Sequence, residues 1–492
     1  MKPSAIVIGS GFAGIAAATT LASEGYAVQL LEKNAEPGGR ARVWRKNGFV
    51  FDMGPSWYWM PDVFERYFAR FGSSVAEHYE LLRLDPSYLV TFSPKETWAL
   101  PAGLPALKEF FERIEPGAGA KLDRFMAEAE LKYELGMSEL VYRPSLSWTE
   151  FMGPKVIGGM LRNSVFGSMR THVAKYFKDR RLRELLEFPV LFLGATPDRT
   201  PALYSLMNYA DMALGTWYPM GGMGRIVDGM IAVAERQGVA IQCSTAVERI
   251  IVEDLRAVGV RTSSGDLRAD VVVAAADYHH VEQQLLEPAQ RTYDHKYWDR
   301  RVMAPSSLLF YLGFNTRLPE LAHHNLFFDR SFDAHAREIY DAPQWPTQPL
   351  MYVCAPSKTD PAVAPEGHEN LFALIPIAPG LEDNETIRQH YLGQVLDRLS
   401  QRTGVNIREH LVLQRGYCIT DFKDDYNAYR GNAYGLANTL MQTAVLKPTM
   451  KSKRVKGLYF TGQLTAPGPG VPPSLISGQV VADLILNERS HA

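Results

Sequence analysis

The chain has 492 residues, a formal net charge of −2, 46% hydrophobic residues and 22% charged residues. This length predicts two domains, and the near-neutral charge gives no reason to expect a nucleic-acid partner. Cys243, Cys354 and Cys418 form no C-x-x-C pair, so we expect neither a disulfide framework nor a zinc site, and a reducing, cytoplasmic setting.

The first forty residues predict a strand, a glycine turn, a helix and a second strand. Ala5–Ile8 is an unbroken apolar run, typical of a strand buried on both faces of a parallel sheet. It leads into the G-x-G-x-x-G of residues 9–14. We expect a helix over Ile15–Glu24 and a strand over Ala27–Leu31, which ends on Glu32. This context predicts a dinucleotide-binding site.

Each residue of this motif has a physical task in such a site. Gly9 allows the tight turn, Gly11 lets the backbone approach a pyrophosphate, and Gly14 lets the helix pack closely on the strand. Glu32 is expected to accept hydrogen bonds from ribose hydroxyls and to repel a 2′-phosphate.

Residues 57–178 carry aromatic, strand and helical patterns. Trp57–Met60 is either a packing cluster or an aromatic wall beside an apolar substrate. Leu89–Phe92 and Thr97–Leu100 predict a hairpin, and apolar spacing predicts helices over Leu107–Ile114 and Ala120–Ser138. The stretch Phe151–Lys178 is basic and amphipathic, so it lies either on an anionic membrane surface or inside the protein with a solvated basic face.

The second half of the chain is rich in strands. Its predicted strands are Val239–Ile241, Val247–Val252, Ala257–Thr262, Val271–Ala275, Ser306–Gly313, Met351–Ala355, Asn370–Pro376 and Gly457–Gly462. Its predicted helices include Glu385–Gln401 and Leu475–Leu486. His279–His280 and His323–His324 are adjacent pairs, and neighbouring side chains point apart in a strand or a helix. We therefore predict structural or solvent-facing histidines and no metal site.

Four segments resemble the FAD-dependent amine oxidase and carotenoid desaturase superfamily, and the last two of them resemble its carotenoid desaturase branch and, within it, the bacterial-type phytoene desaturases. They are Pro37-Gly38-Gly39-Arg40, Gly48–Pro55, Tyr218-Pro219-Met220-Gly221-Gly222-Met223, and the closing Ala466–Ser474 turn. The resemblance implies noncovalent FAD, with the backbone of Val247 against the adenine and Gln463 where amine oxidases place an acid. The cofactor-binding residues that motif and resemblance together predict are Gly9, Gly11, Phe12, Ala13, Gly14, Glu32, Lys33, Gly38, Gly39, Arg40, Gly54, Pro55, Ser56, Val247, Gly462, Gln463, Gly470, Val471 and Pro472.

The expected fold is α/β, with a Rossmann-type FAD-binding domain built from discontinuous segments and a mixed sheet-plus-helix substrate domain. We assign residues 1–75, 215–295 and 425–492 to the first domain. Residues 76–214 and 296–424 form the second, which is expected to associate peripherally with a membrane surface. No apolar run approaches the roughly 18 residues of a spanning helix.

The resemblance implies that the protein introduces double bonds into phytoene, a long apolar polyene, by hydride transfer to the flavin. Glu150 occupies a position resembling an acidic site of the family and is the candidate proton acceptor. No second G-x-G-x-x-G follows a strand, so we expect a quinone or oxygen, and not NAD(P)H, to exchange electrons with the flavin. The alternatives are a desaturase of a hydroxylated or C30 carotenoid, a carotene isomerase, an amine oxidase, and a flavin-bearing membrane scaffold without enzyme activity.

Overall fold

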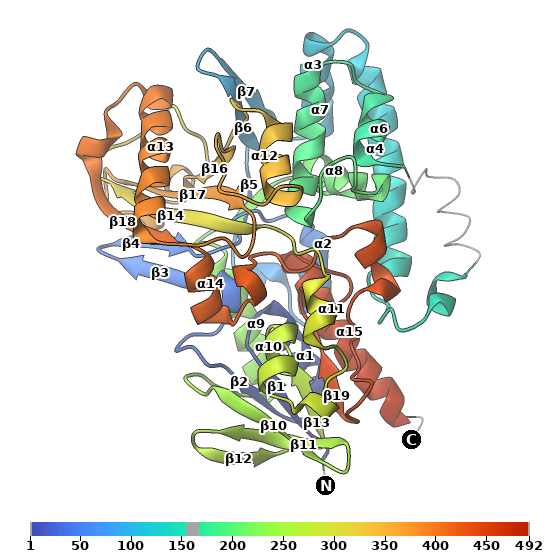
Figure 1. Cartoon of the computed structure of the whole chain (residues 1–492). Helices are drawn as coiled ribbons and strands as arrows, with labels where there is room; N and C mark the ends of the chain where they lie inside the picture. The colour runs from blue at the N-terminus through green and yellow to red at the C-terminus, as the bar shows by residue number, and fades with distance from the viewer. Residues whose placement is uncertain (1, 154–166, 491–492) are drawn as a thin grey trace.

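The computed structural model describes residues 2–153 and 167–490, and the chain folds around two β-sheets (Figure 1). The first sheet is wholly parallel, in the order β19-β13-β1-β2-β9. Its strands come from three distant parts of the chain: β1 (Ser4–Ile8), β2 (Ala27–Leu31), β9 (Ala240–Gln242), β13 (Val271–Ala274) and β19 (Leu458–Phe460). Both chain ends therefore contribute to one sheet, as the dinucleotide motif predicts.

Both faces of this sheet are covered. Ala5 and Val7 of β1 face a core shared with the helices α1 (Phe12–Ser23), α9 (Gly224–Arg236) and α15 (Val471–Ser490). Ile6 and Ile8 face a second core, which they share with the antiparallel strands β10 (Val247–Glu253), β11 (Arg256–Thr262) and β12 (Gly265–Arg268). This double burial explains why Ala5–Ile8 is apolar without interruption.

Close backbone packing joins α1 to the sheet and to α15. A Cβ added at Gly14 would lie 1.8 Å from the carbonyl oxygen of Gly9, and one added at Gly478 would lie 2.2 Å from that of Ala13. Helix α1 begins at Phe12, earlier than the predicted Ile15, because Gly11 is its N-cap and the glycine turn leads straight into the first helical turn. The glycines thus bring the N-terminal and C-terminal segments into direct contact.

The second sheet has seven strands in the order β18-β14-β17-β16-β15-β6-β7, and only β15 and β6 pair in parallel. The strands are β6 (Tyr88–Ser93), β7 (Glu96–Leu100), β14 (Ser306–Phe314), β15 (His324–Phe327), β16 (Met351–Cys354), β17 (Glu369–Ile377) and β18 (Leu411–Tyr417). One face packs on α13 (Glu385–Thr403). The other face carries Leu309, Tyr352 and Leu374 toward the cavity described below.

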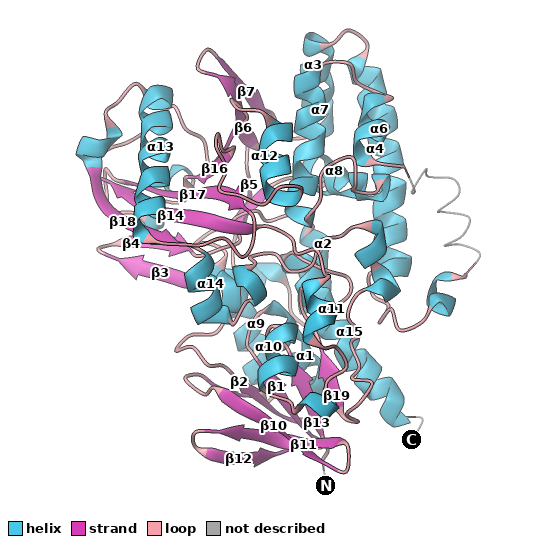
Figure 2. Cartoon of the chain, viewed as in Figure 1, coloured by secondary structure: helices cyan, strands magenta, loops and turns pink. Residues whose placement is uncertain are grey.

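A layer of helices stands beside the second sheet, at the upper right of Figure 2. It contains α3 (Leu104–Ile114), α4 (Ala118–Leu135), α6 (Met169–Ala174), α7 (Arg180–Glu187) and α8 (Leu206–Asn208). The remaining strands and α-helices are β3 (Val43–Lys46), β4 (Phe49–Asp52), α2 (Pro61–Arg70), β5 (Leu81–Arg83), β8 (Trp217–Pro219), α10 (Tyr278–Gln284), α11 (His295–Asp299), α12 (Phe332–Tyr340) and α14 (Ile419–Tyr426).

The expected fold class is confirmed, and so are the predicted hairpin, the helices after residue 103 and the sheet of the second half. The division of the chain into domains at residues 75, 215, 295 and 425 stays a prediction. Residues 154–166 of the basic amphipathic stretch lie outside the described residues. Within the described ranges, we find no helix with the length and apolar character needed to cross a bilayer.

A buried polar network ties these layers together. The Trp59 indole N–H donates to Thr216 Oγ1 (2.9 Å), and the Thr216 hydroxyl donates to Asp211 Oδ1 (2.9 Å). Tyr88 of β6 donates its hydroxyl to Asp211 Oδ2 (2.7 Å). Asp211 is 2% exposed, and its burial raises the pKa of the carboxyl to about 6.

We predict opposite effects for alanine at two helical glycines. Gly478→Ala places a methyl group against the Ala13 carbonyl and is expected to destabilise the protein by about 1–3 kcal/mol. Gly393→Ala in α13 is the matched control, because its methyl group would meet only the Arg408 guanidinium at 3.9 Å. It is expected to stabilise by up to about 1 kcal/mol. Chemical denaturation measures both effects, and equal effects would contradict the close-packing account.

Asp211→Asn is expected to change how stability depends on pH. The folded-state pKa lies above the unfolded value of about 3.9, so ionisation of Asp211 costs stability as the pH rises from about 4 to about 6. The variant lacks this cost, and both neighbouring hydroxyls can reorient toward an amide. Its unfolding free energy relative to wild type should therefore rise by up to about 3 kcal/mol over that range. Parallel stability curves against pH would show that Asp211 does not titrate in this way.

Candidate functional site

One cavity of about 860 Å³ joins the two chain ends to the helical layer. Its wall includes the turn at Gly9–Gly11, the segment Gly38–Arg40, the segment Gly54–Ser56 and the closing turn at Pro469–Pro472. Gly11 and Gly470, 459 positions apart in the sequence, therefore face the same space. The predicted residues that line the cavity are Gly9, Gly11, Phe12, Ala13, Glu32, Lys33, Gly38, Gly39, Arg40, Gly54, Pro55, Ser56, Val247, Gly462, Gln463, Gly470, Val471 and Pro472.

The turn after β1 leaves room for a phosphate group. A Cβ at Gly11 would meet no protein atom within 4 Å, whereas the position of a Cβ at Gly14 is already occupied by the backbone of Gly9. Gly14, which lies behind this turn, is the one predicted cofactor residue that does not line the cavity. Gly11 thus faces open space at the N-terminus of α1, where backbone N–H groups attract anions.

Glu32 lies at the end of β2 and is 4% exposed. Its Oε2 accepts hydrogen bonds from the Ser10 N–H (2.9 Å) and hydroxyl (2.8 Å), and its Oε1 accepts from the Asn34 N–H and amide (both 2.9 Å). These bonds fix the carboxylate at the cavity wall. A carboxylate held there by donors fits the recognition of ribose hydroxyls.

Arg40 places a half-buried positive charge beside the glycine turn. One Nη donates to the Asn432 carbonyl (3.3 Å), and within the described residues Nε has no partner. Burial lowers the pKa of the guanidinium, while Tyr426 and Asp277 oppose that shift. An unpaired guanidinium N–H in a buried site is costly, and a pyrophosphate would satisfy it. This arrangement fits the phosphates of a dinucleotide.

The closing turn aims the start of α15 at the same cavity. Pro472 and Pro473 carry no N–H, and the Ser474 N–H bonds to the Gly470 carbonyl (3.0 Å). Val471 is therefore the residue of the first helical turn whose N–H can be offered to a ligand. Together with the helix dipole, this N–H favours negative charge at that point.

Two predicted residues have contacts that the sequence did not indicate. Lys33 lines the cavity, but its ammonium group donates to the Asp424 carbonyl, next to α14 residues that also line the wall. Gln463 donates to Asn432 Oδ1 (3.1 Å), and Val247 opens β10 at the cavity edge. Sequence reasoning missed residues at the end of α14 and in the segment that follows it, which no recognised motif marks: Asp425, Tyr426, Asn427, Ala433, Tyr434 and Asn438.

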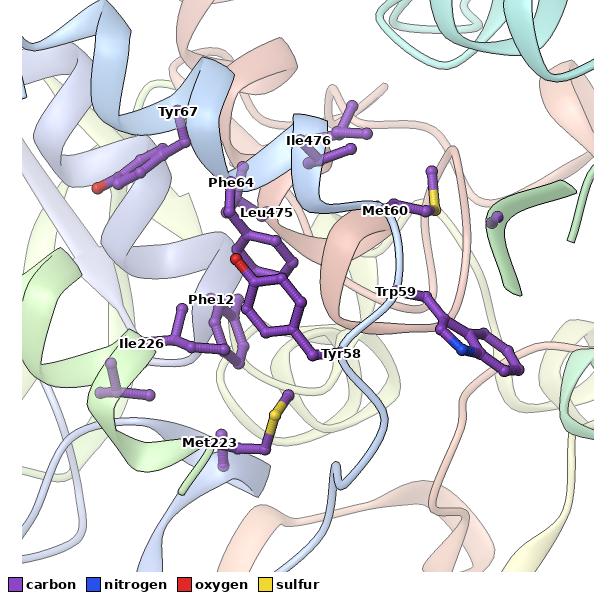
Figure 3. Close-up of a cluster of buried hydrophobic side chains, with 14 of the residues drawn as sticks. Phe12, Tyr58, Trp59, Met60, Phe64, Tyr67, Met223, Ile226, Leu475 and Ile476 are labelled. Atoms are coloured by element: carbon purple, nitrogen blue, oxygen red, sulfur yellow. The ribbon is translucent and has the colours of Figure 1, made fainter. Parts of the chain in front are cut away.

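The segment Trp57–Met60 contributes to both the core and the cavity wall. Tyr58 is fully buried and points into a cluster with Phe12 and Phe64, whereas Trp59 points away from that cluster (Figure 3). Trp57, Trp59 and Met60 line the cavity. Tyr58 is therefore a packing residue, whereas Trp57, Trp59 and Met60 form part of the cavity wall, and their contact with an apolar substrate stays a prediction.

The cavity divides by polarity. The acidic, basic and histidine side chains on the described part of its wall gather at the nucleotide end: Glu32, Lys33, Arg40, Asp277, His280 and Asp425. The rest of the described wall also carries uncharged polar side chains, but much of it is an apolar lobe, lined by Trp57, Trp59, Met60, Met137, Leu140, Val141, Trp148, Phe151, Met152, Leu203, Leu206 and Met207. An ionised substrate finds no counter-charge in this lobe, whereas a hydrocarbon fits it.

Glu150 does not line the described cavity wall, although its neighbours Trp148 and Phe151 do. Its carboxylate accepts hydrogen bonds from the N–H groups of Ser145 (2.9 Å), Leu146 (2.7 Å) and Ser147 (3.0 Å). This arrangement holds the loop. The assignment of Glu150 as proton acceptor stays a prediction.

The expectation that adjacent histidines point apart is wrong for His323 and His324. Both are buried, and their ring centroids are 4.5 Å apart. The reason is that His323 lies in a bend just before β15, where the alternation of a strand does not apply.

Comparisons with known proteins agree with this site. The family model for flavin containing amine oxidoreductase matches residues 12–486. The chain is 42% identical to the carotenoid 3,4-desaturase of Haloarcula japonica, over 98% of each chain. It is 32% identical to the zeta-carotene-forming phytoene desaturase of Myxococcus xanthus, over 98% of this chain and 93% of the other.

Solved structures support the fold. An oxidoreductase from Methanosarcina mazei superimposes with a TM-score of 0.66 at 16% identity, covering 98% of this chain and 100% of that one. Cyclohexylamine oxidase from Brevibacterium oxydans does so with a TM-score of 0.60 at 15% identity, covering 100% of both. The chain therefore belongs to the flavin-containing amine oxidoreductase family and, within it, to the carotenoid desaturases, with FAD as its cofactor.

Proposed function

We propose that this protein desaturates a carotenoid at the 3,4 position, near one end of an already conjugated chain. The observation that carries the proposal is the single cavity that joins a dinucleotide site to an apolar lobe. The identity of 42% with a 3,4-desaturase over nearly the whole chain supports this position of the new double bond. Desaturation of phytoene is the second candidate, supported by the relative from Myxococcus xanthus.

Bound FAD supplies the acceptor for a hydride from the substrate. The chain itself provides position and exclusion of water, which can lower a barrier by several kcal/mol when the reacting atoms are aligned. Trp57, Trp59 and Met60 form the wall on which the polyene lies beside the cofactor site. The N-terminus of α15, with the Val471 N–H, would favour negative charge on a cofactor held against it.

A membrane surface is the proposed source of the substrate. Trp148 and Met152 line the apolar lobe and are 58% and 65% exposed, and Leu146 beside them is 42% exposed. Large apolar side chains at the mouth of an apolar cavity suit entry of a lipid-soluble molecule. A quinone dissolved in the same membrane, or oxygen, is the proposed electron acceptor.

Product analysis tests the proposed reaction. FAD-loaded protein is incubated with liposomes that contain either phytoene or an acyclic conjugated carotenoid saturated at the 3,4 position. We expect the conjugated substrate to lose two hydrogens by mass and to absorb at longer wavelength, and phytoene to react more slowly. Anaerobic bleaching of the flavin by an amine, with neither carotenoid reacting, would overturn the proposal in favour of amine oxidation.

The assignment of Glu150 as proton acceptor predicts that Glu150→Gln lowers kcat by at least about tenfold, or about 1.4 kcal/mol. Glutamine keeps an oxygen for the N–H groups of Leu146 and Ser147, so the loop is expected to persist. FAD content measured by absorbance serves as the control for folding. Unchanged turnover with FAD bound removes Glu150 from the mechanism and leaves it the role of holding the loop.

A further inference from the structure

Behind the aromatic wall, three ligand-type side chains converge at the start of β15. His323, His324 and Cys354 each offer one ligand atom, and these atoms all lie within 4.8 Å of one another. The three residues are 4%, 0% and 3% exposed. The cluster therefore lies outside the cavity, in the interior of the second sheet.

The strand pairing builds this cluster. His324 of β15 and Cys354 of β16 are directly opposite partners. The Ala355 N–H bonds to the His323 carbonyl (2.7 Å), which makes the pair of His324 and Cys354 a non-hydrogen-bonded one. Side chains of such pairs are the closest in an antiparallel sheet. The bend at His323 then adds the second imidazole to the same point.

The hydrogen bonds of both histidines leave the same ring nitrogen free. Nδ1 of His323 bonds to Thr359 Oγ1, and Nδ1 of His324 bonds to the Tyr352 hydroxyl, each at 2.7 Å. Within the described residues, neither Nε2 has a partner, although both atoms are buried. Metal-ligating histidines characteristically bond through the other ring nitrogen to such an outer partner. Two buried ring nitrogens without a hydrogen-bond partner are costly unless a ligand satisfies them.

We propose that His323, His324 and Cys354 form a binding site for a thiophilic d¹⁰ metal ion, monovalent copper or zinc. Imidazole and thiolate ligands together suit both ions. On binding, the Cys354 thiol releases its proton to solvent and its sulfur bonds to the metal. Bond lengths of about 2.0–2.3 Å place ligand atoms about 3.5 Å apart, so the side chains close in by about an ångström.

Charge favours the monovalent ion. One thiolate and two neutral imidazoles give a neutral complex with Cu(I), whereas Zn²⁺ leaves a net positive charge in a buried site. The complex would also fix the cavity wall, because the His324 ring stacks on Trp57 with centroids 4.1 Å apart and planes at 12°. Tyr352, which holds His324, also bonds to Ser56 beside the cofactor site (2.9 Å). This inference does not depend on the identity of the substrate.

Metal titration of the full-length, FAD-loaded protein tests the site. Cu(I) is delivered anaerobically in competition with a chromophoric copper chelator, and Zn²⁺ in a separate arm with a zinc-specific one. We expect one equivalent to bind in at least one arm, with Cu(I) held more tightly, and the thermal midpoint to rise with metal. Less than a tenth of an equivalent at micromolar free metal in both arms would overturn the proposal.

Matched variants locate the bound ion. His323→Gln and Cys354→Ser are each expected to weaken metal binding at least a hundredfold while FAD remains bound. His335→Gln and Cys418→Ser are the controls, because both residues are buried but lie outside the cluster; His335 already uses both ring nitrogens, on the Pro376 carbonyl and the Leu350 N–H. Full binding in either cluster variant, with FAD content retained, would also overturn the proposal.

Discussion

The structure depends on the close approach of two backbones at its centre. Gly14 lies against the Gly9 carbonyl and Gly478 lies against the Ala13 carbonyl, so α1 packs simultaneously on the parallel sheet and on α15. No larger residue permits this approach without displacing one of the elements. Because the turn before α1 and the turn before α15 face the same cavity, this contact assembles the cofactor site from the two ends of the chain.

The cavity has a charged region and an apolar region, and different interactions stabilise a ligand in each. The nucleotide end carries the ionisable side chains Glu32, Arg40 and Asp277 on its wall, where a low local dielectric strengthens interactions between charges. The apolar lobe has no such groups on its described wall, so a hydrocarbon enters it by losing water alone. A flavin held at the boundary between the two regions would have polar groups of the protein on one side and the apolar lobe on the other.

The sequence predicted the structural elements that short, local patterns of residues determine. The strands β1 and β2, the glycine turn, Glu32 and the proline-rich closing turn are each encoded by a few consecutive residues, and the structure has them where expected. The end of α14 and the segment after it were missed, because Asp425 and Tyr426 reach the cavity through long-range packing that no local pattern reports. The convergence of His323 and His324 was missed for a related reason, since it depends on a bend whose position is set by the pairing of β15 with β16.

The cavity wall is shaped by residues that do not line it. Trp59 is held by Thr216 and Asp211, and Trp57 stacks on His324, so each indole has its orientation set from behind. Tyr58, between them, is fixed in the core by Phe64 and by the hydroxyl of Tyr79 (3.0 Å). A rigid wall of this kind positions a flexible polyene without forming hydrogen bonds to it. Differences in substrate among relatives with the same cofactor site can therefore arise in the supporting residues as well as in those that touch the substrate.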